Sequence, residues 1–236
     1  MITTILFDLD GTLLPMDQDL FLKAYMGGMA KKLAAAGYDA QKMLSVIWKG
    51  TAAMVANDGS RTNESILWDL FTAEFGPDAR KDEHIFLDFY HNEFQEVRHA
   101  CGFDPAAAES IRQIKELGFR VALATNPLFP AVATHSRIRW AGMAPEDFEL
   151  VTTYENSSRC KPNPAYFQEV LDALGVTAQE CVMVGNDAVE DMAATQLGIP
   201  VFFLTHSLIN KTNVDITRYP HGDFVDLMNY IRGLNK

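Results

Sequence analysis

Two aspartates near the start of the chain have the spacing that carboxylate chemistry needs. Asp8 and Asp10 follow an apolar run and precede a Gly-Thr turn, in the segment ILFDLDGT (5–12). In an extended chain, residues i and i+2 point to the same side, so the two carboxylates share a face and Leu9 points away. Two acids side by side at the end of a buried strand repel each other, unless a metal ion or a proton shared with a substrate resolves the conflict.

The composition is that of an ordinary globular protein. The chain has 236 residues, of which 48% are hydrophobic and 22% are charged, and its formal net charge is −11. This length allows one domain, or a core that carries an inserted subdomain. No stretch is rich in lysine and arginine, and nucleic acids and anionic membranes both need clustered cations. We therefore expect neither as a partner.

The cysteines and the N-terminal segment bear on the compartment. Cys101, Cys160 and Cys181 are odd in number and widely spaced, so neither a disulfide framework nor a zinc site is expected. The first residues lack the basic stretch and apolar stretch of a signal peptide, and no apolar run approaches the roughly 20 residues that span a bilayer. We therefore expect a cytoplasmic protein.

The chain divides into two regions of different pattern. From about residue 17 to 98 the periodicity is helical, with turn-forming clusters between the segments. From about residue 102, apolar strands alternate with helices. The helical segments of the first region are 19–36, 40–56, 63–75 and 82–97. The expected strands are 3–7, 119–124, 148–153, 180–184 and 201–204, and the later helices are 105–117, 131–140, 164–174, 191–197 and 224–234.

Alternating strands and helices predict an α/β fold with a parallel sheet. The strand at 3–7 belongs to this sheet although the helical region separates it from the others. The simplest architecture is an α/β core of residues 1–15 and 100–236, interrupted by a helical insertion at 16–99. Aromatic residues at helical spacing are expected to form the core of the insertion, namely Trp48, Trp68, Phe71, Phe75, Phe86, Phe89 and Tyr90.

Polar side chains follow three of the predicted strands. Asp8 and Asp10 follow the first, Thr125 and Asn126 the second, and Asp187 the strand at 180–184. In parallel sheets, ligands bind outside the carboxyl ends of the strands. One site that collects all three strand ends is the most economical interpretation.

Four motifs in this order resemble those of the haloacid dehalogenase-like hydrolase superfamily. They are DLDGT (8–12), TN (125–126), CKPNP (160–164) and GNDAVED (185–191). Their order and spacing agree over essentially the whole chain. The resemblance implies a Rossmann-like α/β core with an α-helical cap inserted after the first strand, and a member of the phosphatase type.

The resemblance also implies roles for the acidic residues. Asp8 would be the nucleophile that forms an aspartyl-phosphate. Asp10 would be the general acid for the leaving oxygen and then the base that activates water. Mg²⁺ would be held by the side chains of Asp8 and Asp187 and by the backbone carbonyl of Asp10, because hard oxygen ligands suit this ion. Asn186 stands between Gly and Asp, where many members have the two adjacent.

The remaining motif residues would bind the phosphoryl group. Thr125 offers a hydroxyl and Lys161 a positive charge, and backbone N–H groups, including that of Asn126, would complete the cradle. Asp191 lies at the start of the helix predicted at 191–197. It either orients the metal site from behind or acts as a charge at the helix N-terminus.

The leading hypothesis is a Mg²⁺-dependent phosphatase acting on a small phosphorylated metabolite. The same core also serves phosphomutases, phosphonate-cleaving enzymes with a Schiff-base lysine in the cap, haloacid dehalogenases and non-catalytic phosphate-binding proteins. A dehalogenase needs neither a second acid nor a metal, so Asp10 and Asp187 argue against it. In the cap, Lys49, Arg61 and Asn63 are expected at the solvated surface. The sequence leaves open the substrate and whether the protein is a monomer or a homodimer.

Overall fold

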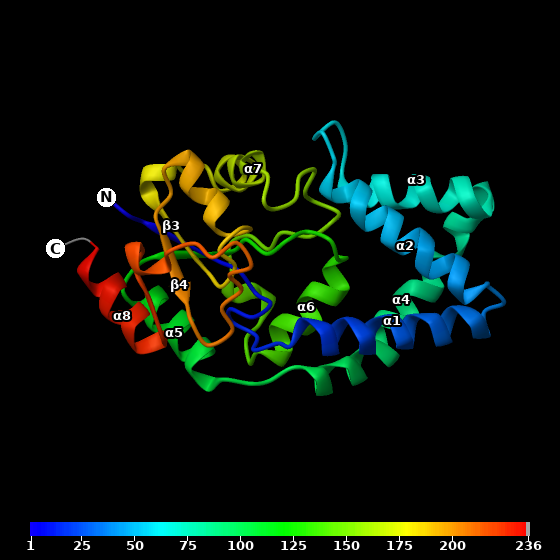
Figure 1. The fold of residues 1–236 in the computed structure, drawn as a ribbon, viewed down its shortest axis with the longest axis horizontal. Helices are drawn as coiled ribbons and strands as arrows, with labels where there is room; N and C mark the ends of the chain where they lie inside the picture. Colours follow the sequence, from blue (N-terminus) through cyan, green and yellow to red (C-terminus); the bar gives the residue numbers. More distant parts are fainter. Residues whose placement is uncertain (235–236) are drawn as a thin grey trace.

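A parallel sheet of five strands lies at the centre of the larger part of the molecule (Figure 1). The structure is a computed structural model, and it describes residues 1–234. The strand order is β2-β1-β3-β4-β5, and every neighbouring pair is parallel. The strands are β1 (Thr4–Phe7), β2 (Arg120–Leu123), β3 (Cys181–Gly185), β4 (Val201–Leu204) and β5 (His221–Gly222). The predicted α/β class and parallel sheet are confirmed.

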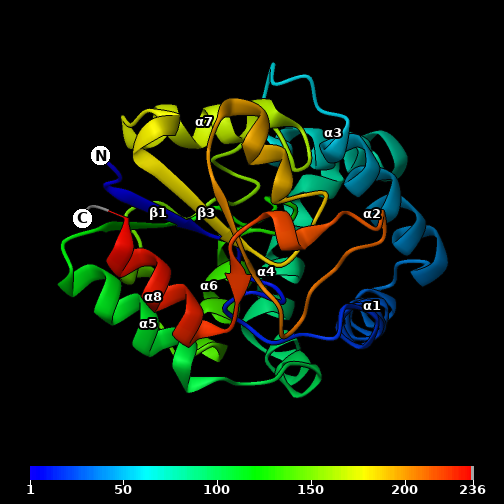
Figure 2. The ribbon, with the colours of Figure 1, turned by 60° about the vertical axis from the view of Figure 1, so that its left-hand side comes forward.

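Helices cover both faces of this sheet (Figure 2). On one face, α5 (Pro105–Glu116) packs against α8 (Phe224–Gly233). On the other face, α7 (Pro164–Leu174) packs against the short 3₁₀-helix Met192–Leu197. The remaining core helix, α6 (Ala131–Trp140), follows β2 and reaches toward the helical insertion.

Successive residues of β1 serve the two faces of the sheet, as a two-residue period requires. Ile5 and Phe7 lie in the same buried cluster as Ile111 of α5, whereas Leu6 lies with Phe167 of α7. A strand that is apolar on both faces must lie in the middle of the sheet. Its last backbone contact there is the N–H of Asp8, which donates to the Val184 carbonyl at 2.9 Å.

The helical insertion lies between β1 and β2, as predicted, and forms the right-hand part of Figure 1. Its elements are α1 (Gln18–Ala35), α2 (Ala40–Val55), α3 (Asn63–Phe75), α4 (Glu83–His91) and the 3₁₀-helices Pro77–Asp82 and Glu93–Ala100. Acidic caps fix two of the helix starts, since Asp17 accepts from the backbone N–H groups of Asp19 and Leu20 at 3.0 Å and Asp39 from that of Lys42 at 2.9 Å. Within residues 1–234, no helix combines the length and apolar character that a membrane span requires.

One predicted helix of the insertion is wrong in its extent. The segment 82–97 is not one helix, because α4 ends at His91 and the chain continues as a 3₁₀-helix from Glu93. The break lies at Asn92, whose side-chain Nδ2 donates to the backbone carbonyl of Asp88 at 3.0 Å and to its carboxylate at 2.8 Å. Asparagine side chains compete in this way with the helical backbone bonds.

Three differences concern the core. The segment 148–153 runs parallel to β2 and shares backbone hydrogen bonds with it, but it forms only an isolated bridge between Leu123 and Val151 instead of a strand. The helix predicted at 191–197 is a 3₁₀-helix that begins at Met192. The two-residue strand β5 was not predicted, because His221 and Gly222 offer no hydrophobic pattern.

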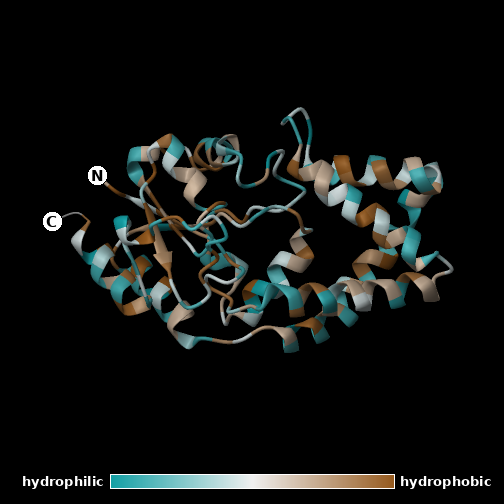
Figure 3. Ribbon diagram, viewed as in Figure 1, coloured by the Kyte–Doolittle hydropathy of each residue, from teal (hydrophilic) through white to brown (hydrophobic). Residues whose placement is uncertain are grey.

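The apolar sides of the cap helices meet in an aromatic core (Figure 3). Trp68, Phe71, Phe89 and Tyr90 are buried there, as predicted. Phe75 and Phe86 are partly buried and pack against this core. The prediction is wrong for Trp48, whose side chain on α2 is 48% exposed.

The chain enters and leaves the helical insertion through two segments that lie side by side. Met16 and Cys101 form an antiparallel bridge, and the N–H of Gly102 donates to the Pro15 carbonyl at 2.7 Å. A Cβ atom at Gly102 would lie 2.9 Å from Cβ of Pro15, so this close approach requires glycine. Both crossings therefore lie beside the carboxyl end of β1, next to the predicted site.

Candidate active site

The carboxyl ends of β1, β2 and β3 open onto one small cavity of about 160 Å³. Every predicted acidic site residue lines it, together with both residues of the predicted Thr-Asn motif. The lining residues are Asp8, Asp10, Gln18, Thr125, Asn126, Leu128, Phe129, Asn186, Asp187, Glu190 and Asp191. The cavity is thus lined by residues from three of the four motifs, together with Gln18 from the start of α1, which the sequence did not indicate.

Lys161 lies beneath the cavity, between two carboxylates. Its Nζ is 2.9 Å from Oδ1 of Asp8 and 2.7 Å from Oδ1 of Asp191, and its side chain is fully buried. Burial alone would lower the pKa of Lys161, but the charges of Asp191 and Asp8 raise it well above its ordinary value. The other oxygen of Asp8 accepts from the Thr12 hydroxyl at 3.1 Å. Both oxygens of Asp8 are thereby held in a fixed orientation.

Asp191 holds the loop that follows β3. Its Oδ2 accepts from the backbone N–H groups of Asn186 and Asp187, both at 2.9 Å, while its Oδ1 pairs with Lys161. Its side chain makes no capping bond to the 3₁₀-helix that follows. Burial raises the pKa of Asp191 to about 6, against the opposing charge of Lys161. Of the two alternatives for Asp191, the contacts favour the one in which it orients the site.

The extra residue Asn186 joins two of the motifs. Its Oδ1 accepts from the Thr12 hydroxyl at 3.0 Å, and its Nδ2 donates to the Ser207 carbonyl at 2.8 Å. Gly11 makes room for it, since a Cβ atom there would lie 2.2 Å from Nδ2 of Asn186, and the backbone has a φ of +83°. The departure from the usual Gly-Asp sequence therefore has a structural reason.

Arg137 is a further residue of the site that the sequence did not indicate. It lies on α6, is 1% exposed, and forms an ion pair with Oδ2 of Asp10. Its guanidinium carbon lies 4.3 Å from the centre of the Phe129 ring. Burial raises the pKa of Asp10, the charge of Arg137 opposes this, and the neighbouring charge of Asp8 adds to the rise. The buried oxygen Oδ1 of Asp10 has no hydrogen-bond partner among residues 1–234.

The polar residues after β2 hold the wall of the cavity. The Thr125 carbonyl accepts from the hydroxyls of Thr152 at 2.7 Å and Tyr166 at 2.8 Å. The Asn126 side chain donates to Oε2 of Glu190 at 3.0 Å and accepts from the backbone N–H of Lys161 at 3.2 Å. The side chain of Asn126 thus links the second, third and fourth motifs.

Carboxylates outnumber the cations of the site. Five acidic side chains line the cavity, and Lys161 and Arg137 are the basic side chains that pair with them. Burial raises the pKa of Glu190 to about 7, against the opposing charge of Lys161. At an effective dielectric of ~20, like charges ~4 Å apart repel by about 4 kcal/mol. Such a cavity accepts a phosphate dianion only when additional positive charge is present.

The oxygen donors of the cavity suit a magnesium ion. Asp8, Asp10 and Asp187 all line the cavity, and Oδ1 of Asp187 also accepts from the backbone N–H groups of Val189 and Glu190 at 2.7 and 3.0 Å. Within residues 1–234, no group of three or more His, Cys, Asp and Glu side chains is arranged as a complete metal site. Magnesium does not require one, because it usually binds one or two carboxylates and completes its shell with water and phosphate oxygens. The residues present therefore fit this ion.

Known proteins resemble this chain in sequence and in fold. A phosphoglycolate phosphatase of Vibrio parahaemolyticus is 26% identical over 232 residues, which cover 97% of this chain and 90% of that protein. A crystal structure of a 2-haloacid dehalogenase from Pseudomonas syringae matches with a TM-score of 0.63 at 19% identity, over 98% of both chains. That of a HAD phosphatase from Thermococcus onnurineus matches with a TM-score of 0.60 at 17% identity, over 98% of this chain and 99% of that one.

The solved structures, at these identities, support the fold and leave the reaction open. They confirm the α/β core with a helical insertion after its first strand. The family model of haloacid dehalogenase-like hydrolases matches residues 2–224, which include all four motifs. The chain therefore belongs to the haloacid dehalogenase-like hydrolases.

Proposed function

We propose that the protein is a Mg²⁺-dependent phosphatase that hydrolyses a small phosphorylated metabolite through an aspartyl-phosphate. The observation that carries this proposal is that two acids at one strand end have different basic partners. Asp8 pairs with a buried lysine, with 2.9 Å between Nζ and Oδ1, while Asp10 pairs with Arg137. The lysine pairs with the carboxylate that would attack phosphorus, and the arginine positions the carboxylate that would exchange a proton.

In the first half-reaction, Asp8 attacks phosphorus. A bond forms between its carboxylate oxygen and phosphorus, and the bond from phosphorus to the leaving oxygen breaks. Asp10 gives its proton to that oxygen, which leaves as an alcohol. Lys161 adds positive charge from beneath Asp8, and the Thr125 hydroxyl offers a hydrogen bond to the phosphoryl oxygens.

In the second half-reaction, water attacks the phosphorus of the aspartyl-phosphate. Asp10 takes the proton of that water, inorganic phosphate leaves, and the carboxylate of Asp8 is restored. Arg137 acts through Asp10 as a positioning residue, since it touches that carboxylate and lines no part of the cavity. Asp191 acts in the same way through Lys161.

Asp8, Asp187 and the carbonyl of Asp10 would hold Mg²⁺. The bound ion supplies the positive charge that lets a phosphate dianion approach the acidic cavity. No lysine of the helical insertion lines this cavity, so the contacts do not favour the phosphonate-cleaving alternative, which needs a Schiff-base lysine.

The test is phosphate release from acetyl phosphate and from an aryl phosphate, with Mg²⁺ and with a chelator. We expect Asp8→Asn to abolish turnover and Asp10→Asn to lower kcat by about 10² to 10⁴. Asp78→Asn is the matched control, because its carboxylate is 83% exposed in the cap and far from the cavity in sequence and contacts. Full activity of Asp8→Asn would overturn the mechanism. Halide release from a 2-haloacid without Mg²⁺ would favour the dehalogenase alternative instead.

A further inference from the structure

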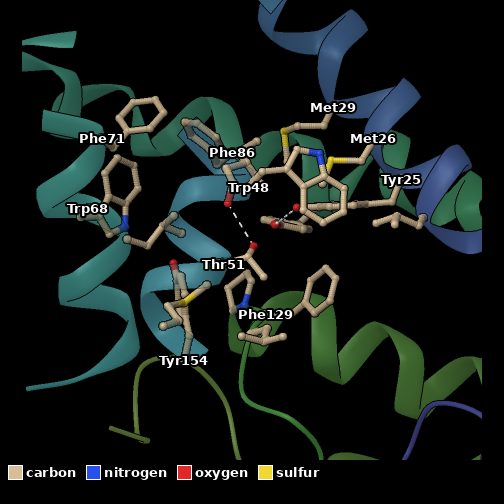
Figure 4. A pocket seen from close by; sticks show the side chains of 17 residues that line it. Tyr25, Met26, Met29, Trp48, Thr51, Trp68, Phe71, Phe86, Phe129 and Tyr154 are labelled. Atoms are coloured by element: carbon tan, nitrogen blue, oxygen red, sulfur yellow. Dashed lines mark hydrogen bonds between the residues drawn. The ribbon is translucent and has the colours of Figure 1, made fainter. Parts of the chain in front are cut away.

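A second cavity, of about 230 Å³, lies inside the helical cap (Figure 4). Helices α1 to α4 form its walls, and the loop after β2 closes its lower side, where Phe129 is labelled in Figure 4. Aromatic, aliphatic and thioether side chains dominate the lining, including Met26, Trp48 and Trp68. No Asp, Glu, Lys, Arg or His side chain lines it.

This apolar cavity adjoins the active-site cavity. Leu128 and Phe129 line both of them, and both side chains are partly buried. The Phe129 ring lies against Arg137, which in turn holds Asp10. Because Asp10 protonates the leaving oxygen, the organic group of a bound phosphoester begins beside Asp10 and extends toward Phe129.

The few polar groups around the apolar cavity are mostly satisfied within the protein. The hydroxyls of Tyr25 and Tyr90 lie 3.0 Å apart, and the Thr51 hydroxyl donates to the Ile47 carbonyl at 3.0 Å, as the dashed lines in Figure 4 show. The Trp68 Nε1 is the exception, since it is buried without a partner among the described residues. The cavity therefore offers a few neutral donors, from tyrosine hydroxyls and tryptophan Nε1 groups, and no charge.

These contacts argue against a substrate with a second anionic group. The carboxylate of a phosphoglycolate-like substrate needs a cation or several donors, yet neither cavity is lined by a lysine or an arginine. Lys161 and Arg137 are already paired with the catalytic carboxylates. The cap cavity therefore offers no cation to a second anionic group of the substrate.

We propose that the organic group of the substrate is uncharged and apolar, an aryl or branched alkyl group, and that it binds in the cap cavity. This inference rests on the proposed phosphatase function, and it specifies the substrate class. Burial of one methylene group is worth about a fourfold change in affinity. We expect kcat/KM to rise about fourfold per carbon from ethyl to butyl phosphate, and to be much lower for phosphoglycolate than for phenyl phosphate.

Charge placed in the cavity should reverse this preference. Thr51 lies on α2 at the wall of the cavity, and Ala52 is its exposed neighbour. Thr51→Arg should lower the ratio of kcat/KM for butyl over ethyl phosphate at least tenfold and raise the relative rate with phosphoglycolate. Thr51→Phe should lower the butyl-to-ethyl ratio by filling the space, without favouring phosphoglycolate. Ala52→Arg adds the same charge outside the cavity and should leave the ratio unchanged.

A binding measurement keeps this inference separate from catalysis. Trp48 lines the cavity, so its fluorescence should change when 2-phenylethanol is added to the Mg²⁺-loaded enzyme, and Thr51→Arg should abolish the change. Turnover of acetyl phosphate without any preference for apolar groups, and no binding of 2-phenylethanol, would overturn the inference and leave the proposed function standing. Binding of 2-phenylethanol without turnover of any phosphoester would overturn the proposed function instead. The apolar group could then no longer be assigned to a phosphomonoester substrate.

Discussion

Buried charges at the site are fixed by partners that come from distant parts of the chain. Lys161 contacts Asp8 and Asp191, and Arg137 contacts Asp10, over separations of 153, 30 and 127 residues. Each cation balances acids that would otherwise repel one another and destabilise the strand end. Removal of one member leaves a buried charge without compensation, which is costly in a folded protein.

The Arg137–Asp10 pair leads to a prediction for a residue outside the motifs. Arg137→Met should destabilise the protein by about 3 to 5 kcal/mol, because it leaves Asp10 unpaired. It should also lower kcat with little change in KM, because Arg137 positions Asp10 and lines no part of the cavity. Arg137→Lys keeps the charge and should recover part of kcat. Urea unfolding and steady-state kinetics measure the two effects.

Arg139→Met is the matched control on the exposed side of α6, and its stability should stay within about 0.5 kcal/mol of the wild type. Equal effects of both substitutions would contradict the positioning role.

The residues of the site differ in how far the sequence could reveal them. Asp8, Asp10, Thr125, Asn126, Asp187 and Asp191 were predicted from motifs, and all of them line one cavity. Lys161 was also predicted near the phosphate, and it lies beneath the cavity between two acids. Arg137 could not be predicted, because Arg139 is also an arginine on the same helix and has similar sequence neighbours. The two differ in burial, which the sequence does not show: Arg137 is buried and Arg139 is exposed.

At the scale of elements, the N-terminus of α3 docks the cap onto the core. Asn63 is fully buried, which contradicts its predicted position at the solvated surface. Its backbone N–H donates to the Ser157 carbonyl at 2.9 Å, and its Nδ2 to the Pro127 carbonyl at 3.2 Å. Its Oδ1 accepts from Nδ2 of Asn57 at 2.9 Å. The position of Asn63 depends on core loops distant in sequence, so its local turn pattern carried no sign of it.

Asn63→Ala should therefore weaken the attachment of the cap. The substitution removes one of the two acceptors of the buried Asn57 amide and the donor to the buried Pro127 carbonyl. Each buried polar group left unsatisfied costs about 1 to 3 kcal/mol. We expect a loss of that order in the free energy of unfolding, measured by urea denaturation. Arg61→Ala, in the same turn, removes an exposed ion pair with Asp69 and should change stability by less than about 1 kcal/mol. An equal loss in both variants would show that Asn63 has no special role in docking.

Local patterns predicted most elements because capping residues and apolar periodicity act over a few residues. The bounds of α3, α6, α7 and β4 agree with prediction. The errors arise where tertiary contacts or a side chain decide the backbone, as at Asn92 within the segment 82–97 and along 148–153 beside β2. The alternation of strands and helices was enough to predict the architecture. The apolar cavity could not be predicted in this way, because its shape depends on how α1 to α4 pack against one another.

At the scale of the whole molecule, the chain carries an excess of acidic residues, and five of the 31 lie at the site. The net charge is −11, and five carboxylates line the active-site cavity. Repulsion among them opposes folding, since the strand ends that carry them must come together. A divalent cation that bound only the folded arrangement would relieve this repulsion, so the proposed function predicts that metal binding and folding are coupled.

Mg²⁺ should therefore stabilise the protein through Asp187. When its concentration is one hundred times the dissociation constant, an ion that binds only the folded protein adds about 2.7 kcal/mol to the free energy of unfolding. Thermal unfolding detects this as a higher Tm. Asp187→Asn should abolish this Mg²⁺-dependent rise, because it removes one ligand, while Asp78→Asn removes the same charge from the exposed cap and should retain it. NaCl at matched ionic strength separates binding from screening. A rise of equal size in both variants would mean that Mg²⁺ screens the overall negative charge and occupies no site at the end of β3.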